Sequence, residues 1–372
     1  MKLLLLAGEE SGALYADALC RVLPPEIEVR GYADYGFKIA DLAVMGFWAV
    51  LCKLRFFLRV RKTMCAAIRE WRPDVVCTVD YPGMNLKLAA YAKKLGIRTV
   101  HVVCPQVWAW RQGRIPKIEA ALDHLCCFFP FEPKLFHPGF AEFVGHPLVD
   151  AFSTSVTARK DGEKLLALLP GSRLGEIEAL LPTMLEASRG LSVRIVIPAA
   201  NDRAYHAIQK IVNRAALKGS IEVVHGGARE LLKRATCAVV ASGTATLEAA
   251  LARCPTVLVY KVGKVTEFIA RRLIKGVHFV GLANIVWEKS LPKGADLSHP
   301  PMPELLQADF RVDNIRKYLL PWLTDVSAYN QAVANLDAAM SLLKSDGAAL
   351  LKIRSAIVVA RFPFEAPESK CG

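Results

Sequence analysis

The chain has 372 residues, a formal net charge of +13, and 53% hydrophobic against 22% charged residues. This length exceeds that of a typical single core and predicts two globular domains of ordinary size. The positive charge favours an anionic partner, and a nucleotide-sugar, a phospholipid surface and nucleic acid are the three candidates. Nucleic acid is the weakest of them, because the sequence has no long basic run, zinc-finger spacing or recognition-helix pattern.

The ten cysteines are scattered and never form a Cys-x-x-Cys pair, which argues against both a disulfide framework and a zinc site. They are typical of buried thiols in a reducing cytosol. The apolar run at residues 1–7 is shorter than an export signal requires, so we interpret it as the first buried strand. No apolar stretch reaches the roughly 20 residues that span a bilayer. We therefore expect a cytoplasmic protein.

Short apolar strands alternate with helical periodicity over the first 150 residues. The predicted strands are 2–7, 29–32, 75–79, 99–103, 125–129 and 143–144, and the predicted helices are 13–23, 42–67 and 86–95. Polar residues follow several of these strands, among them Ser11 and Gly12 after the first strand and Asp80 after the third. Ligands of open α/β sheets bind at the carboxyl ends of the strands, so these residues are predicted to line one wall of a cleft.

Residues 153–162 are polar and lack periodicity, which indicates a linker. A second β/α series follows, with predicted strands at 165–169, 193–198, 222–224, 237–240 and 255–260 and a last helical stretch at 330–344. The alternation predicts an α/β fold with two doubly wound, Rossmann-like domains that face each other across a cleft. The predicted domains are 1–152 and 163–345, and the segment 346–372 is expected to pack back on the first domain.

The turn at residues 170–173 has the composition of a phosphate site. Pro170-Gly171 breaks a buried strand, and a helix that begins near Ser172 would direct free backbone N–H groups at an anion. Arg173 adds a planar fork of donors that suits paired phosphate oxygens. The alternative is an ordinary strand-to-helix turn with a solvated arginine.

A second turn of this kind lies at residues 242–248. The amides of Gly243 and Thr244 can meet a pyrophosphate, and Glu248, about one turn into the following helix, can accept both hydroxyls of a ribose. The helix dipole favours a glutamate near a helix N-terminus without any ligand, and this alternative stays open.

Asp80 is the candidate catalytic base. It follows a strand of the first domain, at the carboxyl edge where ligands of an α/β sheet bind, and a carboxylate there can act as a general base. Its position before Pro82-Gly83 is also typical of an aspartate that starts a turn.

The stretch 42–60 combines large apolar side chains with Lys53, Arg55 and Arg59, and Arg61 and Lys62 follow it directly. An apolar face with a basic rim suits an anionic membrane surface, and a core helix with a solvated basic edge is the alternative. The predicted membrane-binding residues are Phe47, Trp48, Leu51, Phe56 and Phe57.

Six strings occur in an order that is informative as a set. They are Gly8-Glu9-Glu10-Ser11-Gly12, Leu42-Ala43-Val44-Met45-Gly46, Val107-Trp108-Ala109-Trp110-Arg111, Gly145-His146-Pro147, Leu168-Leu169-Pro170-Gly171-Ser172-Arg173 and Ser242-Gly243-Thr244-Ala245-Thr246-Leu247-Glu248. Together they resemble the lipid-A-disaccharide synthases, GT-B glycosyltransferases of lipid A biosynthesis, from about residue 3 to residue 310.

The resemblance implies an inverting transfer from UDP-2,3-diacylglucosamine to 2,3-diacylglucosamine 1-phosphate (lipid X), which yields the β-1,6-linked disaccharide 1-phosphate and UDP. It matches Asp80 to the family's essential aspartate, Ser172 and Arg173 to the groups that neutralise the leaving diphosphate, and Asn284 to a substrate-site asparagine. It also implies an enzyme that is peripheral on the inner membrane, and it is compatible with a homodimer. We expect no cofactor and no metal, because a fixed arginine and a helix N-terminus can stabilise leaving UDP.

The chain departs from the family pattern at Ala13, where an aspartate is usual, at Gly83, which replaces an acid, and at Ala283, which replaces a proline. It is also shorter after Gly31. Two alternatives therefore stay open: a UDP-sugar 2-epimerase of the same fold, and a non-catalytic protein that binds a nucleotide-sugar or a lipid.

Overall fold

The computed structural model describes residues 1–42, 53–109, 112–153, 164–215, 221–261 and 278–358. The chain divides into two compact units. Unit 1 comprises Met1–Pro147 together with Ser345–Gly372, and unit 2 comprises Leu148–Lys344. The chain thus passes from one unit to the other twice, first at the start of α7 (Pro147–Ser153) and again after Lys344. Most of the predicted linker lies outside the described residues.

Unit 1 contains a parallel sheet of six strands in the order β2-β1-β3-β4-β5-β6. The strands are β1 (Lys2–Ala7), β2 (Glu28–Arg30), β3 (Val75–Val79), β4 (Arg98–Val102), β5 (His124–Cys127) and β6 (Ala141–Phe143). Every residue of β3 is buried. A parallel sheet is covered on both faces, which is why its strands appear in the sequence as continuous apolar runs.

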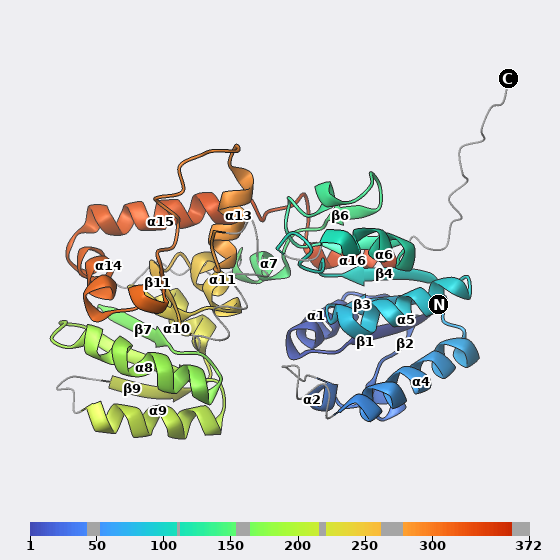
Figure 1. The fold of residues 1–372 in the computed structure, drawn as a ribbon, viewed down its shortest axis with the longest axis horizontal. Helices are drawn as coiled ribbons and strands as arrows, with labels where there is room; N and C mark the ends of the chain where they lie inside the picture. Colours follow the sequence, from blue (N-terminus) through green and yellow to red (C-terminus); the bar gives the residue numbers. More distant parts are fainter. Residues whose placement is uncertain (43–52, 110–111, 154–163, 216–220, 262–277, 359–372) are drawn as a thin grey trace. The chain divides into compact units, whose positions relative to one another are not determined.

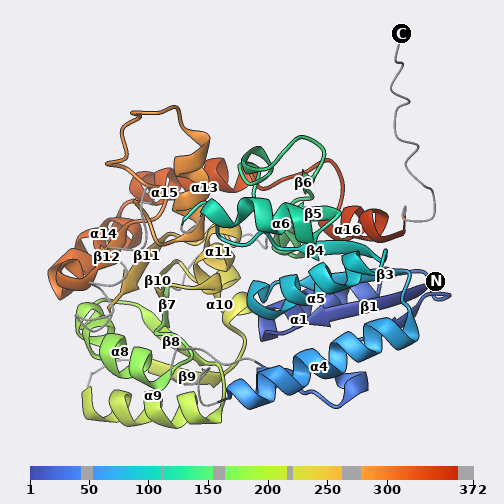
Figure 2. The same cartoon turned by 45° about the vertical axis from the view of Figure 1, so that its right-hand side comes forward.

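Helices cover both faces of the unit 1 sheet (Figures 1 and 2). One core cluster joins α1 (Glu10–Cys20) and the C-terminal helix α16 (Ala349–Val358) to the strands. The opposite face packs against α4 (Leu54–Trp71), α5 (Pro82–Lys94) and α6 (Ile115–Ala121). The short elements are α2 (Ile39–Leu42), η1 (Ala33–Tyr35), η2 (Gln112–Arg114) and η3 (Pro133–Leu135).

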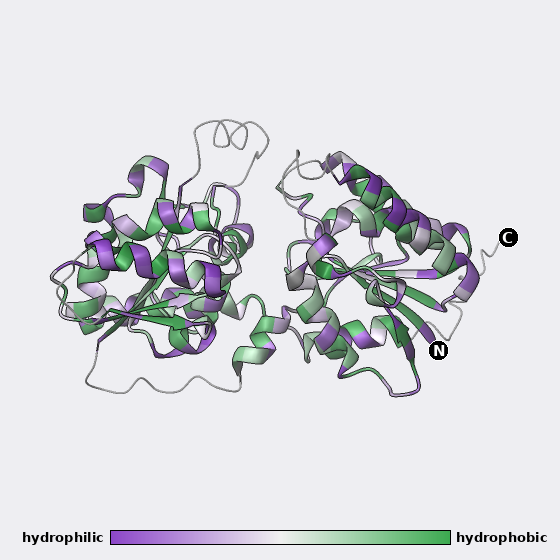
Figure 3. Ribbon diagram, turned by 90° about the horizontal axis from the view of Figure 1, so that it is seen from below, coloured by the Kyte–Doolittle hydropathy of each residue, from purple (hydrophilic) through white to green (hydrophobic). Residues whose placement is uncertain are grey.

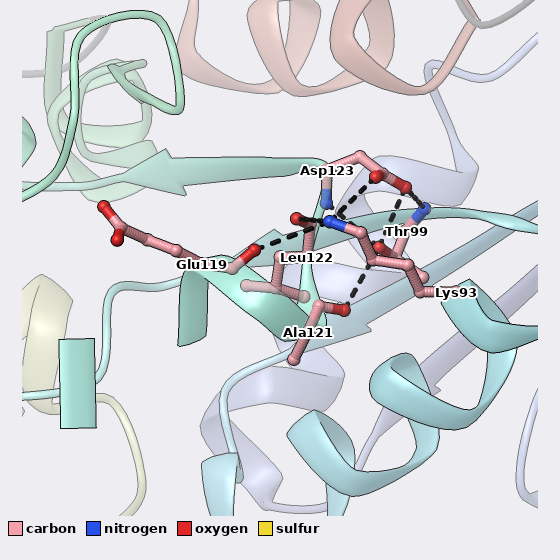
Figure 4. Close-up of polar contacts among 6 residues, drawn as sticks. All are labelled: Lys93, Thr99, Glu119, Ala121, Leu122 and Asp123. Carbon is pink, nitrogen blue, oxygen red and sulfur yellow. Dashed lines mark hydrogen bonds and ion pairs between the residues drawn. The ribbon is translucent and has the colours of Figure 1, made fainter. Parts of the chain in front are cut away.

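A polar network fixes the amino-terminal ends of β4 and β5 to the ends of two helices (Figure 4). Asp123 Oδ2 accepts hydrogen bonds from Thr99 N at 2.8 Å and from Thr99 Oγ1 at 3.1 Å. Lys93 at the end of α5 pairs with Asp123 Oδ1 at 3.1 Å and donates to the carbonyls of Glu119 and Leu122. The network sets the start of β4, and therefore where its carboxyl end emerges.

Unit 2 repeats this architecture with a parallel sheet in the order β12-β11-β10-β7-β8-β9. Its strands are β7 (Leu165–Leu169), β8 (Arg194–Ala199), β9 (Ile221–His225), β10 (Cys237–Ala241), β11 (Thr256–Tyr260) and β12 (Glu304–Leu306). The predicted strands are confirmed to within a few residues, whereas β12 was not predicted. Its three residues are too short to give a periodic signal.

Helices α8 (Leu174–Ser188), α9 (Asp202–Ala215) and α14 (Val312–Thr324) pack on one face of the unit 2 sheet, with α8 and α9 side by side (Figure 2). The remaining elements of the unit are α10 (Ala228–Arg234), α11 (Thr244–Leu251), α13 (Leu282–Ser290), η4 (Gln307–Asp309) and α15 (Val326–Ser341). In the hydropathy colouring of Figure 3, the strands are mostly apolar and the helices alternate between apolar and polar segments. No helix among the described residues is both long enough and apolar enough to cross a membrane.

Candidate active site

A pocket of about 410 Å³ opens at the carboxyl edge of the unit 2 sheet. It is formed where β7 meets α8 and where β10 meets α11, so the N-termini of two helices point into it. The lining residues include Ser172, Arg173, Gly243 and Thr244. The structure therefore brings together the two turns that the sequence separates by about 70 residues. Backbone N–H groups at helix N-termini together with an arginine form an arrangement that binds phosphate.

Arg173 is held in place by a neighbour on its own helix. Its Nη1 lies 2.8 Å from Glu176 Oε1, and the Arg173 side chain remains 62% exposed. Gly171 has φ +102°, and a Cβ atom at this position would overlap the Glu176 carboxylate. Glycine thus allows the turn that lets Glu176 reach back to Arg173. Glu176 was not predicted, although an acid three residues after an arginine at a helix start is a visible signal.

Glu248 lies outside the lining of the pocket. Its Oε1 accepts a hydrogen bond from Arg229 Nη2 at 2.8 Å, and its side chain is 18% exposed. The guanidinium of Arg229 in turn lies 5.5 Å from the ring centroid of Phe152. Arg229 was not predicted, because its relation to Glu248 depends on how α10 and α11 pack.

Asn284 is fully buried and is bonded within unit 2. Its Nδ2 donates to Met302 O at 2.6 Å and to Glu304 Oε1 at 2.8 Å, and its Oδ1 accepts from Met302 N at 3.0 Å. Glu304 also receives the N–H groups of Val280 and Gly281. In this structure the predicted substrate-site residue therefore anchors the start of α13 to the segment that leads into β12.

Asp80 lies at the carboxyl end of β3, in a strained stretch of backbone. Asp80 and Tyr81 both have φ +51°, and Val103, at the end of the neighbouring strand β4, has φ +75°. Left-handed backbone is costly for bulky and β-branched residues, and such strain is concentrated at functional sites. Asp80 N is bonded to Val102 O at 2.9 Å, so the two strained strand ends are adjacent.

Other predicted residues surround Asp80. A Cβ atom on Gly12 would lie 3.7 Å from Asp80 Cβ, and Ser11 precedes Gly12 in the first turn of α1. Gly8 leaves room for the ring of Tyr81, because a Cβ atom there would overlap that ring. Ser11, Gly12 and Asp80 therefore occupy one edge of the sheet.

Glu9 is a further carboxylate at this edge, and it was not among the predicted site residues. Burial, and after it the negative charge of Asp80, raises the pKa of Glu9. Burial also raises the pKa of Asp80, against the hydrogen bond from Tyr81 N, which lowers it. A base with a raised pKa takes up a proton more readily near neutral pH. The position of Glu9 directly after a strand was the available signal.

The predicted membrane-binding residues fall into two groups. Phe47, Trp48 and Leu51 lie outside the described residues. Phe57 is buried in the core of unit 1, and Phe56 is partly buried and packs against Phe37 and Phe57. The prediction is thus wrong for Phe57, because it shares the inward face of α4 with Val60, Met64 and Ile68. The large apolar residues that α4 exposes are Leu54 and Leu58, at 49% and 55%.

Comparison with solved structures defines the class of protein. The chain is similar to a UDP-GlcNAc 2-epimerase from Neisseria meningitidis solved with UDP-GlcNAc, with a TM-score of 0.59, 12% identity and coverage of 96% of this chain and 100% of that one. It is equally similar to the calicheamicin glycosyltransferase, with a TM-score of 0.59, 12% identity and coverage of 96% and 97%. At such identities the likeness shows the fold alone. That fold is the two-domain GT-B fold.

The sequence comparisons are more specific. The family model described as lipid-A-disaccharide synthetase matches residues 3–344. A lipid-A-disaccharide synthase from Chromohalobacter salexigens is 32% identical, over 98% of this chain and 99% of its own length. The chain belongs to the lipid-A-disaccharide synthase family and is a glycosyltransferase.

Proposed function

We propose that the protein transfers diacylglucosamine from UDP to the 6-hydroxyl of a diacylglucosamine 1-phosphate, with inversion, and releases UDP. Family membership supports this substrate pair. The observation that carries the donor assignment is the convergence of Ser172, Arg173, Gly243 and Thr244 in one pocket. Both α8 and α11 begin at this pocket, as a site for a diphosphate requires.

In the proposed mechanism Asp80 takes the proton of the acceptor hydroxyl. Its raised pKa suits a general base, and its strained backbone fixes the direction of the carboxylate. Glu9 contributes a second negative charge at the same edge, which favours proton uptake by the pair. Ser11 and Gly12 provide the small first turn of α1 against which the acceptor binds.

The leaving UDP is stabilised by Arg173 and by the N–H groups of the two helix N-termini. Fixed dipoles and an arginine that point at the developing negative charge can stabilise the transition state as a bound cation does. The described lining of the pocket includes one acidic side chain, Glu176, and it is paired with Arg173. We therefore propose that the transfer needs neither a metal nor a cofactor. Glu248 binds the ribose hydroxyls, with Arg229 as its orienting partner.

Helix α4 is proposed to lie on the anionic surface of the inner membrane, from which the acylated substrates are taken. Leu54 and Leu58 form the apolar contact, and Lys53, Arg55, Arg59, Arg61 and Lys62 are exposed around them. Amphipathic helices with basic rims bind such surfaces through the burial of apolar side chains and through the attraction of basic side chains to anionic lipids.

The decisive experiment incubates the purified chain with UDP-diacylglucosamine and diacylglucosamine 1-phosphate, with and without a chelator. Mass spectrometry should detect the disaccharide 1-phosphate and UDP in equal amounts, at rates that the chelator does not change. Consumption of the UDP-sugar only in the presence of the acceptor would support a transfer reaction. Turnover of UDP-GlcNAc without an acceptor would contradict it and support an epimerase.

A further inference from the structure

Three buried side chains with metal-ligating atoms converge in unit 1. Cys104 follows β4, Cys127 ends β5, and Glu132 lies in the turn after β5. The two sulfur atoms and a carboxylate oxygen all lie within 4.8 Å of one another. The residues are 3%, 0% and 2% exposed. No local pattern indicates this cluster, because Cys104 and Cys127 are far apart in the sequence.

The Glu132 carboxylate is oriented by donors on both of its oxygens. Oε1 accepts from the indole Nε1 of Trp108 at 3.2 Å, and Oε2 accepts from Phe129 N at 3.1 Å. N–H donors on both oxygens hold the carboxyl group in one orientation. The bond to Oε1 also satisfies the indole N–H of Trp108, which is buried. The cluster thus combines three buried, converging ligand atoms with a carboxyl group that is held in one orientation.

We propose that Cys104, Cys127 and Glu132 bind one thiophilic divalent cation, for which Zn²⁺ is the best match. Two thiolates and one carboxylate are zinc ligands, and a three-residue set leaves one position for water. Binding forms two metal–sulfur bonds and one metal–oxygen bond and releases the thiol protons to solvent. The indole N–H and the Phe129 N–H act as the outer partners that orient a ligating carboxylate.

The role of this cation is structural. It ties the segment after β4 to the turn after β5, both at the carboxyl edge of the sheet that carries Asp80. It takes no part in the transfer, so the proposal is independent of the metal-free mechanism above.

The test measures metal on the whole chain. The protein is purified from zinc-supplemented culture, desalted and analysed by elemental mass spectrometry, and the metal-free chain is titrated with Co²⁺ to detect sulfur-to-cobalt charge-transfer absorption. We expect about one equivalent of zinc and a thiolate–cobalt band, as for a three-ligand site. Trp108→Phe, which keeps all three ligands, should weaken binding by about 10- to 100-fold, the usual effect of losing an outer partner.

Cys126→Ala is the matched control for Cys127→Ala, because Cys126 is the neighbouring residue in β5 and belongs to the core cluster on the other face of the sheet. Circular dichroism verifies that each variant is folded. Loss of zinc and of the cobalt band in folded Cys127→Ala, but not in Cys126→Ala, supports the site. Equal metal content in the two variants, no binding by the native chain, or a Cys104–Cys127 disulfide in place of metal would overturn it.

Discussion

The two sheets share a parallel, six-stranded architecture, but the chemistry of their carboxyl edges is opposite. In unit 1 this edge carries the carboxylates of Glu9 and Asp80, and Asp80 lies on strained backbone. In unit 2 it carries small residues, Arg173 and two helix N-termini around an open pocket. The first edge suits proton removal and the second suits binding of a departing anion. In the proposed mechanism, one architecture supplies both halves of a group transfer, because the strand-end residues set the chemistry.

The largest test of this division is Asp80→Asn. It removes the proposed base and should lower kcat by about 10²- to 10⁴-fold. UDP affinity, measured by calorimetry, should stay unchanged, because UDP is assigned to unit 2. A parallel loss of turnover and of UDP binding would contradict the division and would mean that Asp80 is structural.

The next test concerns α4, in which Phe57 is buried in the core whereas Leu54 and Leu58 are exposed. Phe57→Ser should destabilise unit 1 by about 3–5 kcal/mol, as for other buried phenylalanines. Leu54→Ser with Leu58→Ser should leave thermal unfolding unchanged and reduce sedimentation with anionic vesicles. Undiminished sedimentation of the folded double variant would exclude α4 as the membrane contact.

Arg173→Ala addresses the unit 2 edge. A charge-assisted hydrogen bond contributes about 1.5–3 kcal/mol, so donor affinity should fall by roughly 10- to 150-fold. Glu176→Gln is the companion variant, since it keeps Arg173 but weakens its restraint, and its effect should be smaller. Acceptor KM should change in neither variant. A change in acceptor KM alone would assign Arg173 to the other substrate.

Acid stability offers a test that distinguishes the two units. His101 is fully buried, its Nδ1 lies 2.6 Å from Thr78 Oγ1, and its Nε2 has no hydrogen-bond partner. Burial lowers the pKa of His101 to about 3 from an ordinary 6.5. The unfolded chain binds this proton below pH 6.5 and the folded chain does not. The stability that neutral His101 contributes is therefore complete above pH 6.5 and is lost as the pH falls toward 3.

Native unit 1 should accordingly lose more stability between pH 7 and pH 5 than unit 1 of the His101→Gln variant. Hydrogen exchange read by mass spectrometry reports the two units separately, and the difference should be confined to unit 1. Identical pH dependence in the two proteins would rule out His101 as the source.

The smallest expected effect is at the ribose. Glu248→Gln should weaken UDP binding by about 2- to 10-fold, which corresponds to one ordinary hydrogen bond. The loss should be smaller for 2′-deoxy-UDP, which lacks one of the hydroxyls. An equal loss for both ligands would indicate that Glu248 acts only through its bond to Arg229.

Local signals explain what could be predicted from the sequence. The strands were visible as apolar runs, and the turns at 170–173 and 242–244 as small residues between a strand and a helix. The pairing of Arg229 with Glu248 and the convergence of Cys104 with Cys127 depend on helix and strand packing, which no local pattern encodes. Phe57 is an intermediate case. Its spacing from Val60, Met64 and Ile68 marks one helix face, but the sequence alone did not show which face meets the sheet.

The C-terminal helix has a consequence for the order in which the protein is completed. Ile353 and Ile357 of α16 belong to the core cluster of unit 1, and Arg354 Nη1 donates to Val22 O at 3.3 Å. During synthesis, Met1–Pro147 leaves the ribosome first. The core of unit 1 is nevertheless completed only by residues that are translated after all of unit 2. A ribosome that stalled near Lys344 would release a chain in which unit 2 is whole and the acid-bearing unit has a gap in its core.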